Sequence, residues 1–194
     1  MRTMNPPVLL LLVLNFACIA LLTLCFFRRD FRVSAKWWAT SLPHSLCPLF
    51  LLAAYAIGLR PLAPAGWSVA TDLVAVGLSA ASIGLMCFTW GTHRIPLAHF
   101  HQAGDTPRHL VTHGAYRRIR HPFYSSYLLL YAAASVFFPH WVTAGFLVYM
   151  AVTLTLTAAG EERRLSGSEF GDEYRAHIAR TGRFLPSLTG KAGR

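Results

Sequence analysis

The residues best suited to chemistry lie between Tyr116 and Tyr124, where the chain reads Tyr-Arg-Arg-Ile-Arg-His-Pro-Phe-Tyr. Three arginines, a histidine and two tyrosines offer many hydrogen-bond donors just before an apolar run that begins at Phe123. A segment that only anchors a chain at a membrane edge needs one or two positive charges there. The density of donors therefore predicts a site for an anionic or polar ligand.

A second cluster of polar residues follows the last apolar run of the chain. Five of the eight acidic residues fall there, and the first two are Glu161 and Glu162. If the last two apolar runs form an antiparallel hairpin, these carboxylates lie beside Arg120 and His121. The sequence therefore predicts that the two motifs form one site, and a simple ion-pair cluster between helix ends is the alternative.

A site of mixed charge flanked by aromatic rings suits a zwitterionic cofactor such as S-adenosylmethionine. Its carboxylate can pair with arginine or histidine, its ammonium and ribose hydroxyls with glutamate, and its adenine with an aromatic ring. The start of a helix at Pro122 adds free N–H groups that can bind a carboxylate. The pattern makes Arg120 and His121 candidates for positioning and assigns no catalytic acid or base.

The elements that must position these residues are predicted to be transmembrane helices. Apolar residues make up 54% of the 194-residue chain and charged residues only 13%, a balance typical of membrane proteins. Runs close to the length of a membrane span cover Pro7 to Phe27, Pro43 to Leu59, Ser68 to Trp90, Pro122 to Phe138 and Trp141 to Ala159. We expect an all-α, polytopic integral membrane bundle of about five transmembrane helices with a cytoplasmic C-terminal helical tail.

The positive charges predict how such a bundle is oriented. Sixteen of the 18 lysines and arginines follow the first, third or fifth run, which places the N-terminus outside and the C-terminus in the cytoplasm. The short loops, without organellar addressing or a large cytoplasmic domain, favour a bacterial inner membrane. The same rule and contact with anionic membrane lipids account for the net charge of +10, so no nucleic-acid partner is predicted. Residues 1–90 then form three transmembrane helices, and residues 91–194 form a catalytic region of loop, helical hairpin and C-terminal lid.

Two further patterns each allow two interpretations. In the third run, Gly77 with Ala81 and Ala80 with Gly84 are pairs of small residues four apart, which predict close packing at the centre of the bundle or a dimer face. Beyond Glu161, apolar residues recur every three to five positions with interruptions near Gly167 and Gly171. This spacing predicts an amphipathic helix, either a lid over the site or a helix on the membrane surface.

Histidines crowd the loop before the first motif, at His99, His101, His109 and His113. Only Asp105 accompanies them, without cysteine or glutamate at ligand spacing. We therefore predict no metal site.

Several motifs together resemble the superfamily of isoprenylcysteine carboxyl methyltransferases and phospholipid methyltransferases. They are Leu-Val-Thr-His-Gly-Ala-Tyr at 110–116, Arg-His-Pro-Phe-Tyr at 120–124, Glu161-Glu162 with Leu165, Phe-Gly-Asp-Glu-Tyr at 170–174, and Arg183 with Pro186. Their order and spacing cover residues 102–187, nearly half of the chain.

The resemblance implies a fold in which the last two spans and the tail enclose S-adenosylmethionine, while a lipophilic small molecule or prenylated substrate enters from the bilayer. The expected cofactor contacts combine the positions that match the family motifs with the residues of the predicted polar site. They are Gln102, His109, Leu110, Val111, Tyr116, Arg120, His121, Pro122, Tyr124, Glu161 and Glu162.

The methyl acceptor stays open between oxygen, sulfur and nitrogen nucleophiles. Thr157 stands where the eukaryotic isoprenylcysteine enzymes carry a substrate-binding arginine, and the absence of a dedicated base favours a carboxylate or thiol acceptor. The alternatives are a phospholipid N-methyltransferase, an NADPH-dependent membrane reductase and a lipid-binding protein without activity. Comparing S-adenosylmethionine with NADPH binding discriminates a methyltransferase from the reductase, and binding of neither cofactor would favour the inactive lipid-binding protein.

Overall fold

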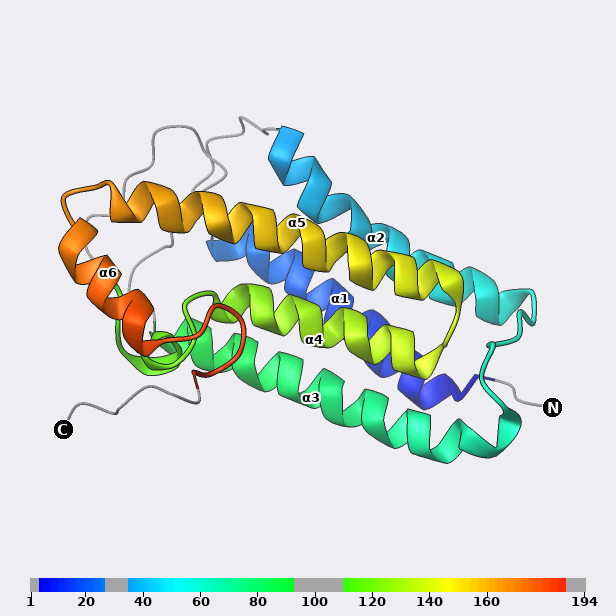
Figure 1. Ribbon diagram of the computed structural model, residues 1–194. Helices are drawn as coiled ribbons and strands as arrows, with labels where there is room; N and C mark the ends of the chain where they lie inside the picture. The colour runs from blue at the N-terminus through cyan, green and yellow to red at the C-terminus, as the bar shows by residue number, and fades with distance from the viewer. Residues whose placement is uncertain (1–3, 27–34, 93–109, 188–194) are drawn as a thin grey trace.

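The computed structural model describes residues 4–26, 35–92 and 110–187, which fold into a bundle of helices (Figure 1). Five long helices lie side by side, and a short sixth helix crosses the end where α5 finishes and α4 begins. The helices are α1 (Pro6–Phe26), α2 (Ala35–Ala56), α3 (Ser68–Thr92), α4 (Pro122–Phe137), α5 (Trp141–Ser166) and α6 (Gly171–Arg180), with 3-10 turns η1 (Ala65–Trp67) and η2 (Gly114–Arg117).

Each of the five predicted apolar runs lies largely in a helix, and two of the helices extend well beyond their runs. The second helix begins at Ala35 rather than Pro43, so Pro43 and Pro48 lie inside it. A proline removes one backbone hydrogen bond, and neighbouring helices can compensate for this loss. The fifth helix, α5, continues past Ala159 to Ser166, because the glutamate, arginine and leucine residues after the apolar run favour helix until Gly167 ends it.

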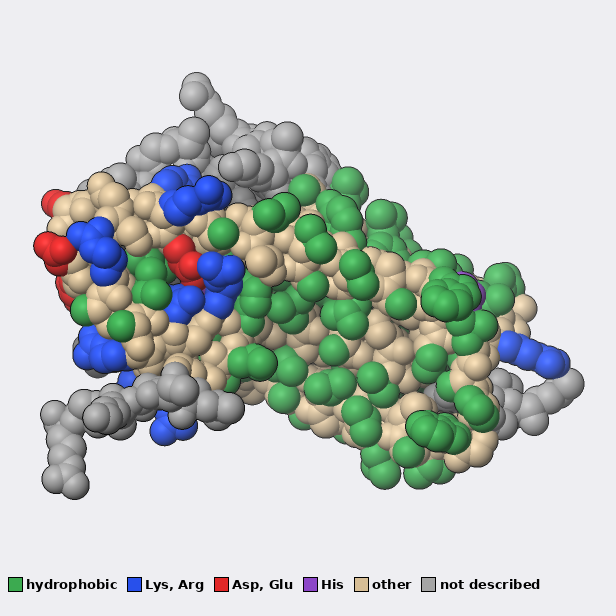
Figure 2. All heavy atoms as spheres, viewed as in Figure 1, with side chains coloured by type: hydrophobic (Ala, Val, Ile, Leu, Met, Phe, Trp, Pro, Cys, Tyr) green, Lys and Arg blue, Asp and Glu red, His purple; other side chains and the backbone are tan. Residues whose placement is uncertain are grey.

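Two helices, α3 and α5, are long and apolar enough to cross a membrane by length and composition. Pro6–Leu21 and Ser41–Ala56 are shorter apolar stretches, and α4 has 16 residues. At 1.5 Å per residue, α4 is about 24 Å long, somewhat less than the thickness of a bilayer core. Five membrane crossings therefore stay a prediction. Figure 2 shows hydrophobic side chains over the visible face of the long helices and charged ones gathered at the α6 end.

The centre of the bundle is α4, with α1, α3 and α5 around it. Leu130 and Tyr131 of α4 are fully buried, as are Leu12 of α1, Leu51 of α2 and Leu154 of α5. The aromatic side chains of Phe16, Phe137 and Phe138 complete this core.

The packing role predicted for the small residues of α3 was wrong. Gly77, Ala80, Ala81 and Gly84 face outward in the described part of the molecule. The helix instead turns its hydroxyl-bearing face to the interior, where Ser82 Oγ donates to the carbonyl oxygen of Ser126 at 2.7 Å. A hydrogen bond between the helices and buried apolar residues such as Ala75 and Met86, rather than close contact of glycines, join α3 to the bundle.

The predicted hairpin of the last two runs is present, joined by Phe138, Pro139 and His140. His140 Nδ1 accepts a hydrogen bond from Val142 N at 3.2 Å, and Thr143 Oγ1 donates to the carbonyl oxygen of Phe138 at 2.7 Å. These bonds cap α5 and fix the turn. As a result, the start of α4 and the end of α5 come together at the opposite end of the hairpin.

Candidate functional site

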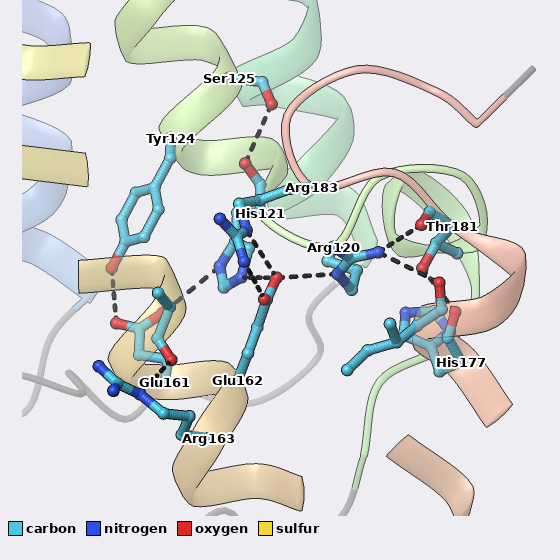
Figure 3. A network of polar contacts seen from close by, with 12 residues as sticks. Arg120, His121, Tyr124, Ser125, Glu161, Glu162, Arg163, His177, Thr181 and Arg183 are labelled. Atoms are coloured by element: carbon cyan, nitrogen blue, oxygen red, sulfur yellow. Dashed lines mark hydrogen bonds and ion pairs between the residues drawn. The ribbon is translucent and has the colours of Figure 1, made fainter. Parts of the chain in front are cut away.

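Three segments that are distant in the sequence meet at this end: the approach to α4, the last turn of α5 and residues 181–187, which we call the strap (Figure 3). Ile119 and Gly182 form a parallel bridge, in which Arg120 N donates to Gly182 O at 2.8 Å and Gly182 N donates to Arg118 O at 3.1 Å. One residue on, His121 N donates to Arg183 O at 3.1 Å. The strap therefore occupies the backbone donors of Arg120 and His121, directly before the start of α4.

Glu162 is the centre of a buried ion-pair network. Arg183 binds both of its carboxylate oxygens, with Nη2–Oε2 at 2.6 Å and Nε–Oε1 at 3.1 Å, and Arg120 Nε lies 2.9 Å from Oε1. His121 Nε2 is 3.3 Å from the same oxygen. The side chains of Arg120 and Glu162 are each 10% exposed, so these charges depend on one another for compensation.

Arg120 also holds α6 in place. Its Nη1 donates to the carbonyl oxygens of Thr181 and of Ile178, the latter at 3.3 Å. Carbonyls at a helix C-terminus lack partners within the helix, and a cation there opposes the helix dipole favourably. The structure thus supports the ion-pair alternative for Arg120, whose predicted cofactor contact stays a prediction.

Glu161 faces different partners from Glu162. Tyr124 OH donates to its Oε1 at 2.6 Å, and His121 Nδ1 lies 3.4 Å from its Oε2. The His121 and Tyr124 rings stack with centroids 5.3 Å apart and planes 3° from parallel. Glu161 is 3% exposed, so His121, Tyr124 and Glu161 form a compact unit at the boundary between the polar network and the bundle interior.

His121 lies between the two carboxylates, and they decide its charge. Burial disfavours the imidazolium, but hydrogen bonds and charge from Glu161 and Glu162 outweigh that effect and raise the pKa of His121 above its usual value. His177 on α6 behaves in the opposite way. Burial, and then the charges of Arg180, Arg120 and His121, lower the pKa of His177 to about 4.

The remaining predicted contacts surround this unit or lie beyond the described residues. Leu110 and Val111 are half-buried in the segment before η2, and Pro122 is buried as the first residue of α4. Burial first, and then the charge of the Glu161 carboxylate, raise the pKa of Tyr116.

Two predicted cofactor contacts, Gln102 and His109, lie outside the described residues, as do three more members of the histidine-rich loop, His99, His101 and Asp105. Its remaining histidine, His113, is exposed.

Gly114 fixes the turn that carries Tyr116. Its φ of +58° is in the region that favours glycine, and a Cβ there would overlap with the side chain of Thr92 at the end of α3. Ala115 N donates to Thr92 Oγ1 at 3.4 Å. The turn therefore rests directly on α3.

Sequence reasoning missed the rings that continue from Tyr124 into the bundle. Tyr127 and Tyr131 follow it on α4, and His44 of α2 packs against both. The spacing of the three tyrosines, at i, i+3 and i+7, was a usable signal because such residues share one helix face. The contribution of His44 could not be found without the packing of α2.

Comparisons with known proteins add evidence on activity. The chain is similar to methanethiol S-methyltransferase 1 of Bradyrhizobium diazoefficiens, with 30% identity over 172 aligned residues. This chain has a methyltransferase relative. The alignment covers 77% of this chain and 58% of the relative, so the chain spans little more than half the length of that protein. No protein-family model matches the sequence.

Proposed function

We propose that this protein is an integral membrane methyltransferase that uses S-adenosylmethionine and methylates a small lipophilic thiol entering from the bilayer. The observation that carries the proposal is the buried unit of His121, Tyr124 and Glu161, placed where the polar network meets the apolar bundle. The methyltransferase relative supports methyl transfer, and its printed name supports sulfur as the acceptor atom.

The residues present fit the proposed cofactor. Glu161 offers carboxylate oxygens for hydroxyl and amino groups, and the faces of Tyr124 and His121 suit a flat base or a sulfonium cation. Tyr116, Leu110, Val111 and Pro122 complete the predicted binding set. When bound, S-adenosylmethionine supplies a methyl group that the acceptor sulfur takes with its own electron pair, leaving neutral S-adenosylhomocysteine and a proton.

Glu161 is the carboxylate better placed to receive that proton. Arg120 and Arg183 both pair with Glu162, which stabilises its negative charge and weakens it as a base. Glu161 has one basic partner, His121, and otherwise accepts a hydrogen bond from Tyr124. We therefore assign proton acceptance to Glu161, directly or through the Tyr124 hydroxyl, and orientation of that carboxylate to His121.

The same geometry weighs against the reductase alternative. A nicotinamide dinucleotide phosphate requires cations for its phosphate groups, but Arg120 and Arg183 are engaged with Glu162. Methylation of phospholipid amines remains the second candidate, because its cofactor requirements are the same. A phospholipid amine differs from a small thiol because the site would have to accommodate its polar headgroup.

The decisive experiment is isothermal titration of the detergent-purified protein with S-adenosylhomocysteine and, separately, with NADPH. We expect micromolar binding of S-adenosylhomocysteine, at least tenfold weaker binding in Tyr124→Ala, and unchanged binding in Arg175→Ala, whose ion pair with Asp172 is exposed. Binding of NADPH alone would overturn the methyltransferase proposal.

The acceptor is tested with methanethiol, a prenylcysteine and phosphatidylethanolamine, each with radiolabelled S-adenosylmethionine. Label is expected in the volatile methyl sulfide. Label in lipid alone would establish the phospholipid alternative, and label in the prenylcysteine alone would establish carboxylate methylation.

A further inference from the structure

A row of rings extends from the proposed site into the centre of the bundle. Tyr124 lies 6.3 Å from Tyr127, Tyr127 lies 4.9 Å from His44, and His44 lies 5.3 Å from Tyr131, measured between ring centroids. Phe16 of α1 packs edge-on against Tyr131 at 5.3 Å. We call Tyr124, Tyr127, His44 and Tyr131 the aromatic row.

The aromatic row begins on the side of the site that faces the apolar bundle, away from the ion pairs. On the strap side, Arg120, Arg183 and Glu162 occupy the space with charged groups and backbone hydrogen bonds. On the other side, Tyr124 contacts Glu161 and is followed by Tyr127. An apolar acceptor that arrives from the bilayer meets Glu161 from this side.

At the inner end of the row, a buried polar group lacks a hydrogen-bond partner among the described residues. The Tyr131 hydroxyl is fully buried and has no hydrogen-bond partner in the described part of the chain. Asn15 of α1, next to Phe16 in the sequence, donates from Nδ2 to Ser79 Oγ at 2.9 Å, while its buried Oδ1 likewise lacks a partner among the described residues. Buried polar atoms without partners are costly, so the row does not end in an inert apolar core.

From these observations we propose that Tyr127 and His44 form the inner wall of the acceptor site and limit the acceptor to a short, apolar thiol. This inference rests on the proposed thiol methyltransferase function. Tyr127 and His44 are in edge-to-face contact directly behind Tyr124, so a longer alkyl chain would have to displace one of their rings. Aromatic rings are also favourable neighbours for a thiol sulfur and for a sulfonium.

The test compares methyl transfer to methanethiol, ethanethiol, butanethiol and hexanethiol by wild type and Tyr127→Ala. Removing the Tyr127 ring should raise kcat/KM for hexanethiol relative to methanethiol at least tenfold, mainly through a lower KM for the longer thiol. Tyr127→Leu serves as a second variant where the alanine variant does not fold.

Phe50→Ala is the matched control, because it removes a ring that packs against Phe138 and His140 at the far end of the bundle. If Tyr127 variants that remain folded and active keep the wild-type preference among the thiols, or if Phe50→Ala shifts it equally, the proposed wall is contradicted. A wild type that binds S-adenosylhomocysteine but methylates none of the thiols would instead reject the proposed acceptor class, and the inference with it.

Discussion

Glu161 and Glu162 are adjacent in the sequence, yet their carboxylates differ in surroundings and in proposed role. Glu162 is held by two arginines that also connect α6 and the strap to the bundle. Glu161 is held by a tyrosine and a histidine at the entrance to the aromatic row. One residue therefore organises the structure, and its neighbour is the one that we propose to contact a ligand.

Replacing Glu161 by glutamine separates its two proposed roles. As a proton acceptor, Glu161 is needed for turnover, so Glu161→Gln should lower kcat with methanethiol by about 100-fold or more. As a cofactor contact, it should also contribute to affinity, and the titrated Kd for S-adenosylhomocysteine should rise. If the variant binds S-adenosylhomocysteine as tightly as wild type, Glu161 does not contact the cofactor. If the variant turns over normally, Glu161 is not the proton acceptor.

The raised pKa of His121 predicts a pH dependence of stability. Its native state binds the proton more tightly than the unfolded state, whose pKa is about 6.5. This contribution is complete below pH 6.5 and is lost as the pH rises through the native pKa. Thermal unfolding in detergent between pH 6.5 and 9 should therefore show wild type losing stability relative to His121→Gln.

Measuring above pH 6.5 avoids interference from His177, whose low pKa gives the opposite dependence. The unfolded state binds that proton first, so His177 reduces stability as the pH falls from about 6.5 towards 4. A constant difference between wild type and His121→Gln from pH 6.5 to 9 would contradict a charged His121.

At the scale of elements, the helical hairpin and the tail could be predicted from the sequence, whereas the strap could not. Apolar runs and the glycines near 167 and 171 mark helix boundaries through local propensity, which a single sequence displays. The strap is held by backbone bonds to residues 118–121, about 60 residues earlier in the chain, and by the ion pair of Arg183 with Glu162, 21 residues earlier. Local propensity does not predict pairing between segments that are distant in the sequence.

The same distinction explains the error over α3. Small residues at spacing four indicate that a helix can be approached closely, but not from which side. Ser79 and Ser82 turned the opposite face inward through bonds to Asn15 and Ser126. For the site, motif order correctly brought Arg120 and His121 to the glutamates, while the ligand roles of these residues stay predictions.

Loss of the Glu162 charge should release the tail. Glu162→Gln leaves Arg120 and Arg183 without their shared counter-ion, and breaking a buried pair of this kind costs about 3–5 kcal/mol. We expect a lower unfolding temperature and faster tryptic cleavage after Arg180 and Arg183. Glu169→Gln, at an exposed position between α5 and α6, is the control and should behave as wild type.

The turn at Gly114 should tolerate no side chain. Gly114→Ala combines a positive φ with overlap on Thr92, a cost of about 1–3 kcal/mol. Gly145→Ala in α5, where a Cβ meets nothing within 4 Å, should be neutral or slightly stabilising. Equal unfolding temperatures for the two variants would contradict a strained turn.

For the whole molecule, the charged end carrying the site is predicted to lie in the cytoplasm. Alkaline phosphatase fused at the C-terminus of the protein expressed in bacteria should be inactive, and a fluorescent protein fused there should be bright. Phosphatase inserted between α2 and α3, in residues 57–64, should be active. The reverse pattern would place the site, and its cofactor, on the wrong side of the membrane.

The strap also sets the order in which the protein becomes functional during synthesis. Residues 119–121 leave the ribosome about 60 residues before the segment that binds them, so the helices can insert while the polar end is still open. Arg183 then supplies the second arginine to Glu162 and closes the end around His121. A protein truncated after Arg180 should thus keep all its long helices and still lack the second arginine at Glu162.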